Sequence, residues 1–388
     1  MILRSLLIGA CSYLVPKRRG LVVFYSAFEP RRFGGNLRAV FEAMQAEMRS
    51  GRELVWLAAS SRLAAELRSR GIPARSYFIR PVWMLLRAEW IVLDKNEPYF
   101  GLGRFRMLQL WHGTGFKRIA LETPGMSGSR LLAMRWHFRK YQLIVANCEE
   151  DRLRKMRSFG NSNAVILGSP RNDSLMSGRG APALLQRLGL DQSRKIISYC
   201  PTFRDSGEAR PFTPEGWRAL DAMLERKGAI LLVKRHRFDE ALAVPPGLPH
   251  VRDISAQVGD VMELLAITDL LVSDYSGIVT DFVLTGRPVL FYTYDTAHYQ
   301  ANGDRLYYNL FETLPGPFIE TEQGLVDALA DESWFSTAEY QKRYQAFRAR
   351  FHHYLDDQST ARTVAACEAL MARSAPAALN AAALKDRP

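Results

Sequence analysis

The sequence predicts an α/β protein of two doubly wound domains, each with a parallel sheet covered by helices on both faces. Short continuous apolar runs alternate with helical patterns along the chain, as in parallel sheets whose strands are buried on both sides. The alternation falls into two blocks, separated by Ser174–Arg194, where Gly178, Gly180 and Pro182 indicate a linker. A length of 388 residues suits two domains. Ligands are then expected at the carboxyl ends of the strands.

The first predicted domain covers residues 1–178 and the second covers residues 179–372. The strands expected in the first are Leu21–Tyr25, Leu54–Ala58, Trp90–Asp94, Met107–Trp111, Leu143–Ala146 and Ala164–Leu167, with helical patterns at Leu37–Met48 and Ser60–Arg70. The strands expected in the second are Lys195–Tyr199, Ala229–Lys234, Leu270–Ser273 and Val289–Tyr292, with helical patterns at Pro214–Lys227, Val258–Ile267, Ile278–Thr285, Thr337–Tyr354 and Thr360–Met371. The alanine-rich segment 373–388 is expected to be a disordered tail.

The cysteines do not suggest a metal or disulfide framework. They are scattered and form no CxxC spacing: Cys11, Cys148, Cys200 and Cys367. This usage predicts buried or free thiols in a reducing compartment. Neither HExxH nor an EF-hand pattern is present, so no metal site is expected.

The formal net charge of +12 indicates an anionic partner. Met1–Gly20 and Ser129–Tyr141 both combine basic with bulky apolar residues, which is typical of interfacial helices on anionic lipid and also of amphipathic helices with a solvated basic face. The apolar run Leu6–Val15 is too short to span a bilayer and ends in Pro-Lys-Arg-Arg rather than in a signal-peptide cleavage site. We therefore expect peripheral association with an anionic membrane surface. Nucleic acid is not expected as a partner, because no nucleic-acid-binding motif accompanies the charge.

Two short stretches, Leu110–Lys117 and Ser273–Phe282, carry the strongest functional signal. Each follows an expected buried strand and turns through small residues, and the second then enters a helix. Free backbone N–H groups and a positive helix end favour an anion at such a turn. The two stretches therefore predict two domain faces that meet across a cleft.

Two further strand ends in the second domain add cationic and hydroxyl groups. They are Pro201, Thr202 and Arg204 after Lys195–Tyr199, and Lys234, Arg235 and His236 at the end of Ala229–Lys234. Because parallel strands end at the same sheet edge, these groups predict a rim that handles phosphate. Each also has an ordinary alternative: His236 capping a strand, Arg204 pairing with Asp205, or Ser276-Gly277 simply starting a helix.

Five ordered motifs resemble those of a known family. They are Trp-His-Gly-Thr-x-x-Lys (Trp111–Lys117), Gly-x-Pro-Arg-Asn-Asp (Gly168–Asp173), Pro-Thr-x-Arg-Asp (Pro201–Asp205), Lys-x-His (Lys234–His236) and Ser-Asp-Tyr-Ser-x-x-x-x-Asp-Phe (Ser273–Phe282). They resemble the CDP-glycerol glycerophosphotransferase family, which includes teichoic-acid primases and polymerases and related capsule enzymes. The resemblance implies a GT-B fold of two Rossmann-like domains with the active site between them. It also implies a peripheral enzyme at the cytoplasmic face of the cell membrane and a lipid-linked or glycan acceptor. No cofactor is implied, since the CDP-alditol is a substrate.

The chemistry that the resemblance implies is attack by an acceptor hydroxyl on the β-phosphorus of a CDP-alditol, most readily CDP-glycerol, with release of CMP. Such a step needs a base for the hydroxyl proton and positive charge around the pyrophosphate. His112 is the expected base, because imidazole titrates near neutral pH. His236, beside Lys234 and Arg235, is expected to neutralise the pyrophosphate and stabilise the departing CMP.

The remaining expected contacts surround these groups. Ser276 and the N–H of Gly277 are expected as donors at the helix start. Asp281 either accepts hydrogen bonds from donor hydroxyls or pairs with a neighbouring arginine, while Lys117 either holds the His112 turn or meets acceptor phosphate. Arg171 and Thr202 match family positions that contact the donor. The other expected substrate-binding residues are Gly113, Thr114, Gly115, Pro201 and Arg204.

Four positions depart from the family pattern. Gly115 and Arg237 stand where proline is usual, Phe203 where tryptophan is usual, and Gly277 where a second serine is usual. The ionisable groups remain, so activity is expected to persist while the accepted polyol phosphate changes. Gly277 loses a hydroxyl donor but keeps its backbone N–H.

Two other classes compete with this interpretation. A GT-B glycosyltransferase that uses a nucleotide sugar would share the fold and the cleft, but the pairing of Trp-His-Gly-Thr with Ser-Asp-Tyr-Ser disfavours it. A non-catalytic basic module that binds anionic lipid or nucleic acid would have no need of His112 and His236 at strand ends.

Overall fold

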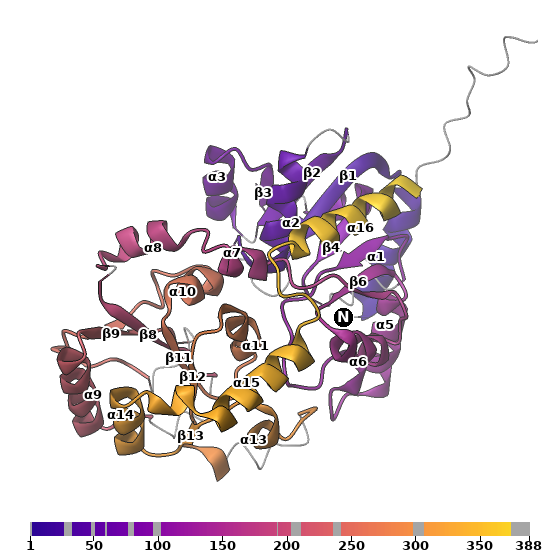
Figure 1. The fold of residues 1–388 in the computed structure, drawn as a ribbon. Helices are drawn as coiled ribbons and strands as arrows, with labels where there is room; N and C mark the ends of the chain where they lie inside the picture. The colour runs from indigo at the N-terminus through magenta and orange to yellow at the C-terminus, as the bar shows by residue number, and fades with distance from the viewer. Residues whose placement is uncertain are drawn as a thin grey trace, which may run out of the picture.

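The protein consists of two α/β domains, each built on a fully parallel sheet (Figure 1). The computed structural model describes residues 2–26, 33–47, 51–58, 60–76, 81–95, 102–191, 193–202, 211–235, 242–297 and 306–373. This architecture confirms the predicted fold class. The tail expected over 373–388 lies outside the described residues from 374 onward.

The first sheet has the strand order β3-β2-β1-β4-β5-β6-β7, and every neighbouring pair is parallel. This order places a topological switch point between β1 and β4, as in doubly wound nucleotide folds. The strands are β1 Arg18–Tyr25, β2 Glu53–Ala58, β3 Ala74–Ser76, β4 Ala88–Leu93, β5 Met107–Gln109, β6 Tyr141–Ala146 and β7 Ala164–Ile166.

The second sheet repeats the pattern, with the order β10-β9-β8-β11-β12-β13. Its switch point lies between β8 and β11, so the turns that follow these two strands are neighbours at one sheet edge. The strands are β8 Lys195–Tyr199, β9 Ala229–Val233, β10 Val251–Asp253, β11 Leu270–Ser273, β12 Val289–Tyr292 and β13 Phe318–Ile319.

Each sheet is buried on both faces because its strands alternate apolar side chains between two separate cores. On β1, Val22 and Phe24 enter one core, while Val23 and Tyr25 enter the other. The helices that cover the sheets are α1 Ile2–Leu14, α2 Gly35–Ala46, α3 Ser61–Ser69, α4 Pro81–Arg87, α5 Gly128–Phe138, α6 Glu149–Phe159, α7 Asn172–Met176, α8 Ala181–Leu188, α9 Pro214–Arg226, α10 Val261–Ile267, α11 Ile278–Phe282, α13 Leu310–Thr313, α14 Glu322–Ala330, α15 Ala338–Phe351 and α16 Ser359–Arg373, with short 3-10 helices η2 Ala120–Glu122, η3 Val283–Thr285 and η5 Ser333–Ser336.

Two segments differ from what the sequence analysis expected. The expected linker Ser174–Arg194 contains helix α8, whose Leu184 and Leu188 are buried in the second domain's core. Helix α16, which the sequence analysis groups with the second domain, returns to the first sheet, where Val364 and Cys367 join its core beside α2 (Figure 1). The helical pattern was recognised in α16, but which sheet it covers depends on the path of the chain.

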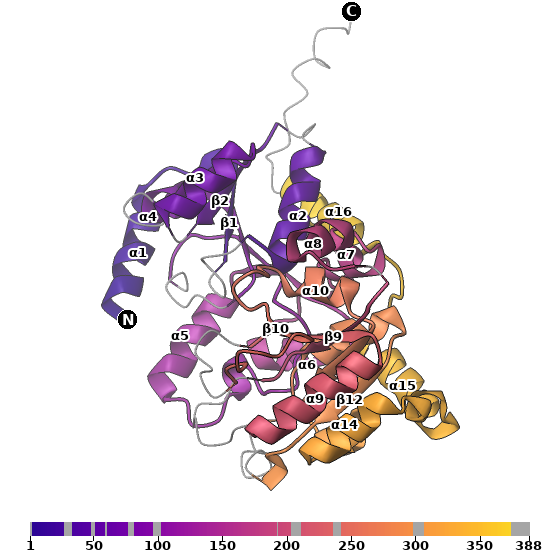
Figure 2. The ribbon, with the colours of Figure 1, turned by 90° about the vertical axis from the view of Figure 1, so that its left-hand side faces the viewer.

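The N-terminal domain carries α1, α4 and α5 on one side, away from the second domain (Figure 2). Helix α1 packs against α4 and contributes Ile8 to the core. Among the residues that the structure describes, no helix is long and apolar enough to cross a membrane.

Candidate functional site

The strand ends of the two domains enclose a cavity of about 1050 Å³. Each predicted site residue that the structure describes lines this cavity: His112, Gly113, Thr114, Gly115, Lys117, Arg171, Pro201, Thr202, Lys234, Arg235, Ser276, Gly277 and Asp281. The two others, Arg204 and His236, lie outside the described residues, as do the departures Phe203 and Arg237. Motifs far apart in the sequence therefore meet at one place.

The turn that carries His112 is held by side chains rather than by helix geometry. Strand β5 was expected to run to Trp111 but ends at Gln109, because Trp111 adopts a φ of 54°. Gln109 Oε1 accepts from the Trp111 N–H at 2.9 Å. The buried amide of Asn36 donates to Leu110 O at 3.2 Å and to Trp111 O at 2.9 Å. This unusual backbone projects the next residue, His112, into the cavity.

The His112 ring is oriented by one hydrogen bond and one stacking contact. Its Nδ1 lies 2.7 Å from the carbonyl oxygen of Asp94, and the Trp111 ring stacks on it with centroids 4.4 Å apart. A carbonyl only accepts hydrogen bonds, so Nδ1 carries the proton. In the neutral ring, Nε2 then carries the lone pair that a general base requires.

The pKa of His112 is lowered to about 4, chiefly by burial and also by the nearby cations Arg171, Lys95 and Lys155. The hydrogen bond to Asp94 opposes this shift without cancelling it. The imidazole is therefore neutral at physiological pH, which is the form that can take a proton.

Gly113 and Arg171 fit together in a way that only glycine permits. Gly113 has a φ of 115°, and a Cβ added there would lie 2.1 Å from Arg171 Nη2. The Arg171 guanidinium forms an ion pair with Asp281 from the other domain. Of the two roles expected for Asp281, pairing with a neighbouring arginine is the one observed.

Thr202 is anchored by Asp274, a buried residue of the Ser-Asp-Tyr-Ser motif. The Thr202 N–H is 2.9 Å from both Asp274 carboxylate oxygens, and its hydroxyl donates to Oδ1 at 2.7 Å. The motif residue Asp274 thus fixes the turn after β8 to the turn after β11.

Two cations follow β9, Lys234 and Arg235, and both line the cavity. Arg235 Nε donates to Asp253 Oδ2 at 2.7 Å, and its backbone N–H donates to Ser255 Oγ at 3.0 Å. The Arg235 charge is therefore partly balanced by Asp253. Lys234 lines the cavity, and its backbone N–H donates to Tyr199 O at 2.9 Å.

The two glycines that depart from the family pattern pack against each other. A Cβ added to Gly277 would lie 3.1 Å from Gly115 Cα and 3.3 Å from Thr114 O. The preceding Ser276 accepts a hydrogen bond from the Ile278 N–H at 3.4 Å. The backbones of the two motifs thus approach each other closely at these small residues.

Charged residues of α6 also line the cavity, and the sequence analysis missed them. Asp151, Arg154 and Lys155 are buried. Lys155 Nζ donates to Asp151 Oδ2 at 2.8 Å and to Val145 O at 2.8 Å, and burial lowers its pKa. Their signal was available: α6 follows the expected strand Leu143–Ala146, and the charges recur at helical spacing on one face.

Lys117 lines the cavity, and its two expected roles stay predictions. Its backbone forms an isolated antiparallel bridge with Leu306, next to Tyr307, which also lines the cavity. This bridge ties the segment after His112 to the second domain. Within the described ranges, no three His, Cys, Asp or Glu side chains are grouped closely enough to hold a metal ion.

Two parallel-sheet domains with cationic and hydroxyl groups at their facing strand ends define a GT-B-type architecture. A family profile described as CDP-Glycerol:Poly(glycerophosphate) glycerophosphotransferase matches residues 8–368. The chain belongs to this family, as its motifs predicted.

Several curated teichoic acid enzymes are similar in sequence. The teichoic acid glycerol-phosphate transferase of Staphylococcus aureus is 26% identical over 371 residues, covering 88% of this chain and 91% of the relative. The teichoic acid ribitol-phosphate polymerase TarL of the same species is 28% identical over 299 residues, covering 73% of this chain and 52% of TarL. The chain thus spans about half the length of TarL and of its relative TarK.

Solved structures of the wall teichoic acid polymerase TagF have the same fold. One matches with a TM-score of 0.80 at 21% identity, covering 96% of this chain and 95% of the TagF chain. A TagF structure soaked with CDPG matches with a TM-score of 0.81 at 20% identity, covering 95% and 93% of the two chains. These matches confirm the predicted GT-B fold.

Proposed function

We propose that this protein transfers an alditol phosphate, most readily glycerol phosphate, from a CDP-alditol to a hydroxyl of a lipid-linked or glycan acceptor. The reaction releases CMP and serves the synthesis of a cell-surface polymer. The observation that carries the proposal is the single cavity in which neutral His112 meets the cationic and hydroxyl groups of the second domain. Membership of the glycerophosphotransferase family supports the donor class.

His112 is the proposed general base. With Nδ1 bound to Asp94 O, Nε2 takes the proton of the acceptor hydroxyl as its oxygen bonds to the β-phosphorus. The bond between that phosphorus and the bridging oxygen breaks, and CMP leaves with the electron pair. A well-placed base contributes about 10²- to 10⁴-fold in rate.

The donor pyrophosphate is proposed to bind between Arg171, Thr202 and Lys234, with Ser276 and the Gly277 N–H as further donors. Buried Nε of Arg171 has no hydrogen-bond partner among the described residues, so a phosphate oxygen there would satisfy it. His236 remains the proposed neutralising group for the leaving CMP. We predict that its replacement by alanine weakens both CDP-glycerol binding and turnover.

The acceptor is proposed to approach along Lys117, next to the His112 turn.

No dissociable cofactor takes part in the proposed step. Turnover should therefore survive dialysis against EDTA, which provides a direct check on this part of the proposal.

The test is a donor panel. The purified protein is incubated with a short acceptor and CDP-glycerol, CDP-ribitol or UDP-sugars, and release of CMP and UDP is measured along with product mass. The proposal expects CMP and a product heavier by one or more alditol phosphates. Release of UDP with transfer of a sugar would instead establish the competing glycosyltransferase activity.

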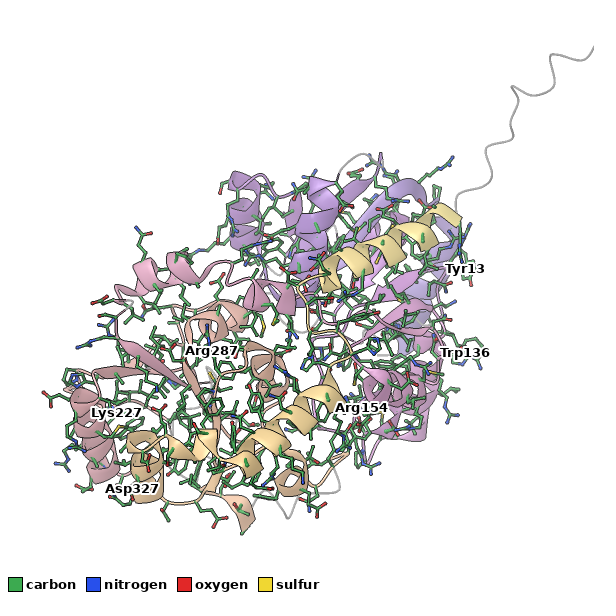
Figure 3. The ribbon with its side chains drawn as sticks, in the orientation of Figure 1. Tyr13, Trp136, Arg154, Lys227, Arg287 and Asp327 are labelled. Carbon is green, nitrogen blue, oxygen red and sulfur yellow. The ribbon has the colours of Figure 1, made fainter. Side chains whose placement is uncertain are left out.

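Membrane association is proposed through the outer side of the first domain. Large apolar side chains are exposed there on three helices: Leu7, Tyr13 and Leu14 on α1, Trp83 on α4, and Leu132 and Trp136 on α5. Tyr13 and Trp136 project from the same edge of the molecule (Figure 3). Exposed apolar and aromatic side chains gathered on one side are typical of surfaces that meet a partner or a lipid interface.

The basic residues that serve this surface lie mainly on α5. Arg130, Arg135 and Arg139 are exposed, whereas Lys17 donates to Leu86 O at 2.8 Å and Arg18 forms an ion pair with Glu53. Lys17 and Arg18 are thus engaged within the protein, and the exposed arginines of α5 are better placed for anionic headgroups. A soluble CDP-donor and a lipid-linked acceptor would meet at the cytoplasmic face of the membrane.

Vesicle flotation tests this surface. Each cation near an anionic surface is worth about 1 kcal/mol, so replacing Arg135, Arg139 and Lys140 by serine should weaken binding to phosphatidylglycerol vesicles by roughly 3 kcal/mol. Transfer to a short water-soluble acceptor should be retained. Equal low-salt binding by parent and variant would remove α5 from the membrane surface.

A further inference from the structure

A buried set of hydrogen bonds joins the His112 turn to both domains, and it begins at α6. Asp151 is 1% exposed. Its Oδ2 accepts from the Asn147 N–H at 2.9 Å, and its Oδ1 accepts from Arg154 Nη2 at 3.0 Å. Asp151 therefore connects the loop after β6 with the Arg154 guanidinium.

Arg154 extends these hydrogen bonds to the His112 turn and to the second domain. Its Nη1 lies 2.9 Å from the Gly115 carbonyl oxygen and 2.9 Å from the Tyr308 hydroxyl. Figure 3 shows Arg154 where the two domains adjoin. The carbonyl of Gly115, three residues after His112, is thus held by a buried cation.

Thr280 of α11 holds the adjacent carbonyl from the opposite side. Its hydroxyl lies 3.0 Å from Thr114 O and 2.7 Å from Gly277 O, so one hydrogen is shared between the catalytic turn and its own helix. The next residue along α11 is Asp281, which pairs with Arg171. The Thr280 contact therefore sets the distance between the His112 turn and the proposed binding site for the CDP-alditol.

His352, at the end of α15, closes the ring. It is buried; its Nε2 donates to Thr280 O, and its Nδ1 lies 2.9 Å from Asn147 Nδ2. Asn147 Nδ2 also donates to Phe351 O at 2.6 Å. The ring runs from Asp151 through Asn147, His352, Thr280, Thr114, Gly115 and Arg154 back to Asp151.

The contacts define one protonation state for His352. Thr280 O can only accept, so Nε2 carries a proton, and the Asn147 amide nitrogen can only donate, so Nδ1 offers a lone pair. Rotating the Asn147 amide would leave its oxygen facing Phe351 O, so the orientation is set by the backbone. A neutral imidazole fits, in keeping with burial, which lowers the pKa of His352.

We propose that His352 is a positioning residue. It holds the His112 turn at a fixed position relative to the proposed donor-binding residues of the second domain, across the domain interface. The proposal rests on the proposed function, because that function gives the His112 turn its catalytic task. His352 does not touch the reacting groups; it acts through Thr280 and Asn147. A misplacement of about 1 Å between base and donor can cost about 100-fold in rate.

Three variants test the proposal. His352→Phe keeps a ring but removes both hydrogen bonds. His352→Gln keeps one donor and one acceptor in a neutral side chain, and His353→Phe changes the exposed neighbouring histidine as a matched control. The measurements are kcat and KM for CDP-glycerol, melting temperature, and hydrogen exchange of the peptides covering 107–118 and 276–285.

The expected result is a fall in kcat of about 10- to 100-fold for His352→Phe, with KM for CDP-glycerol within about threefold of the parent. Hydrogen exchange should quicken in both peptides. His352→Gln should recover most of kcat and of the slow exchange, and His353→Phe should match the parent.

Parent-like kcat and exchange in His352→Phe would overturn the proposal. If that variant does not fold, Thr280→Val decides the question, because it removes the hydroxyl contacts to Thr114 O and Gly277 O and keeps the carbonyl that His352 contacts: unchanged kcat and exchange would overturn the proposal, and faster exchange with lower kcat would support it. If the parent releases no CMP from any CDP-alditol, the proposed function fails. The exchange measurements would then still show whether His352 holds the turn.

Discussion

The two turns that face each other in the cavity are built in different ways. The turn after β11 continues into α11 and η3, and Ser276 bonds to the Ile278 N–H two residues on. The turn after β5 enters no helix and is held by Asn36, Asp94 and Arg154, which lie far from it in the sequence. The turn after β11 leads directly into a helix, although Asp274 also joins it to Thr202, whereas the turn that carries His112 has no helix and depends on contacts from other parts of the chain.

Because the two turns are built differently, they supply different chemical groups to the cavity. The side chains around His112 bury the imidazole and lower its pKa, which keeps the proposed base neutral. The turn after β11 presents hydroxyl and backbone groups, and its Asp281 is paired with Arg171 of the first domain. Changes in the His112 turn should therefore act on the chemical step, and changes in the turn after β11 should be milder.

The largest effect is expected for His112→Ala. Transfer should fall by about 10²- to 10⁴-fold because the base is lost, while the affinity for CDP-glycerol stays within about threefold. Turnover assays and isothermal titration measure the two quantities. Near-normal turnover would show that the base is another group and that the two turns do not differ in this way.

A smaller but still large effect is expected for Gly113→Ala. The residue has a left-handed φ, which costs an L-residue about 1–2 kcal/mol, and the new Cβ would displace the Arg171 guanidinium. We expect kcat/KM to fall by at least about tenfold. Gly178→Ala is the matched control, because Gly178 also has a positive φ but open space around it; similar losses in both variants would contradict the role of the Arg171 contact.

Gly277→Ser should have a modest effect. Its Cβ would lie 3.1 Å from Gly115 Cα, so the turns must separate by a few tenths of an ångström. We expect kcat/KM to fall about two- to fivefold, and Gly259→Ser, whose Cβ would meet open space, to match the parent. A loss of a hundredfold would mean that the turn after β11 is as sensitive as the His112 turn.

The smallest effect on kcat/KM is expected from a change of pH between 5.5 and 7.5. The proposed base His112 must be neutral to take a proton, and its pKa of about 4 means that activity is expected above that pH and lost only as the pH falls through it. Between pH 5.5 and 7.5, kcat/KM should change less than about twofold from this group. A tenfold decrease per unit below pH 6.5 would show an unperturbed imidazole.

Much of the fold followed from local pattern. Continuous apolar runs predicted β8, β11 and β12 with their observed bounds, because strands buried on both faces must be apolar throughout. The short edge strands β3, β10 and β13 were not predicted, since two or three residues carry too little periodicity to detect. Helix α8 was mistaken for a linker because Gly178 and Gly180 precede it and Pro182 stands in its first turn.

The sequence by itself determined the two-sheet architecture and the residues at the strand ends, because a parallel sheet places all its carboxyl ends at one edge. Only the tertiary structure decided which of these groups are paired, buried or in contact. Asp281 meets Arg171, Gly277 meets Gly115, and His352 closes a ring with Asn147 and Thr280. Such contacts join residues from different domains, and their geometry depends on how the two sheets are docked, which no local periodicity encodes.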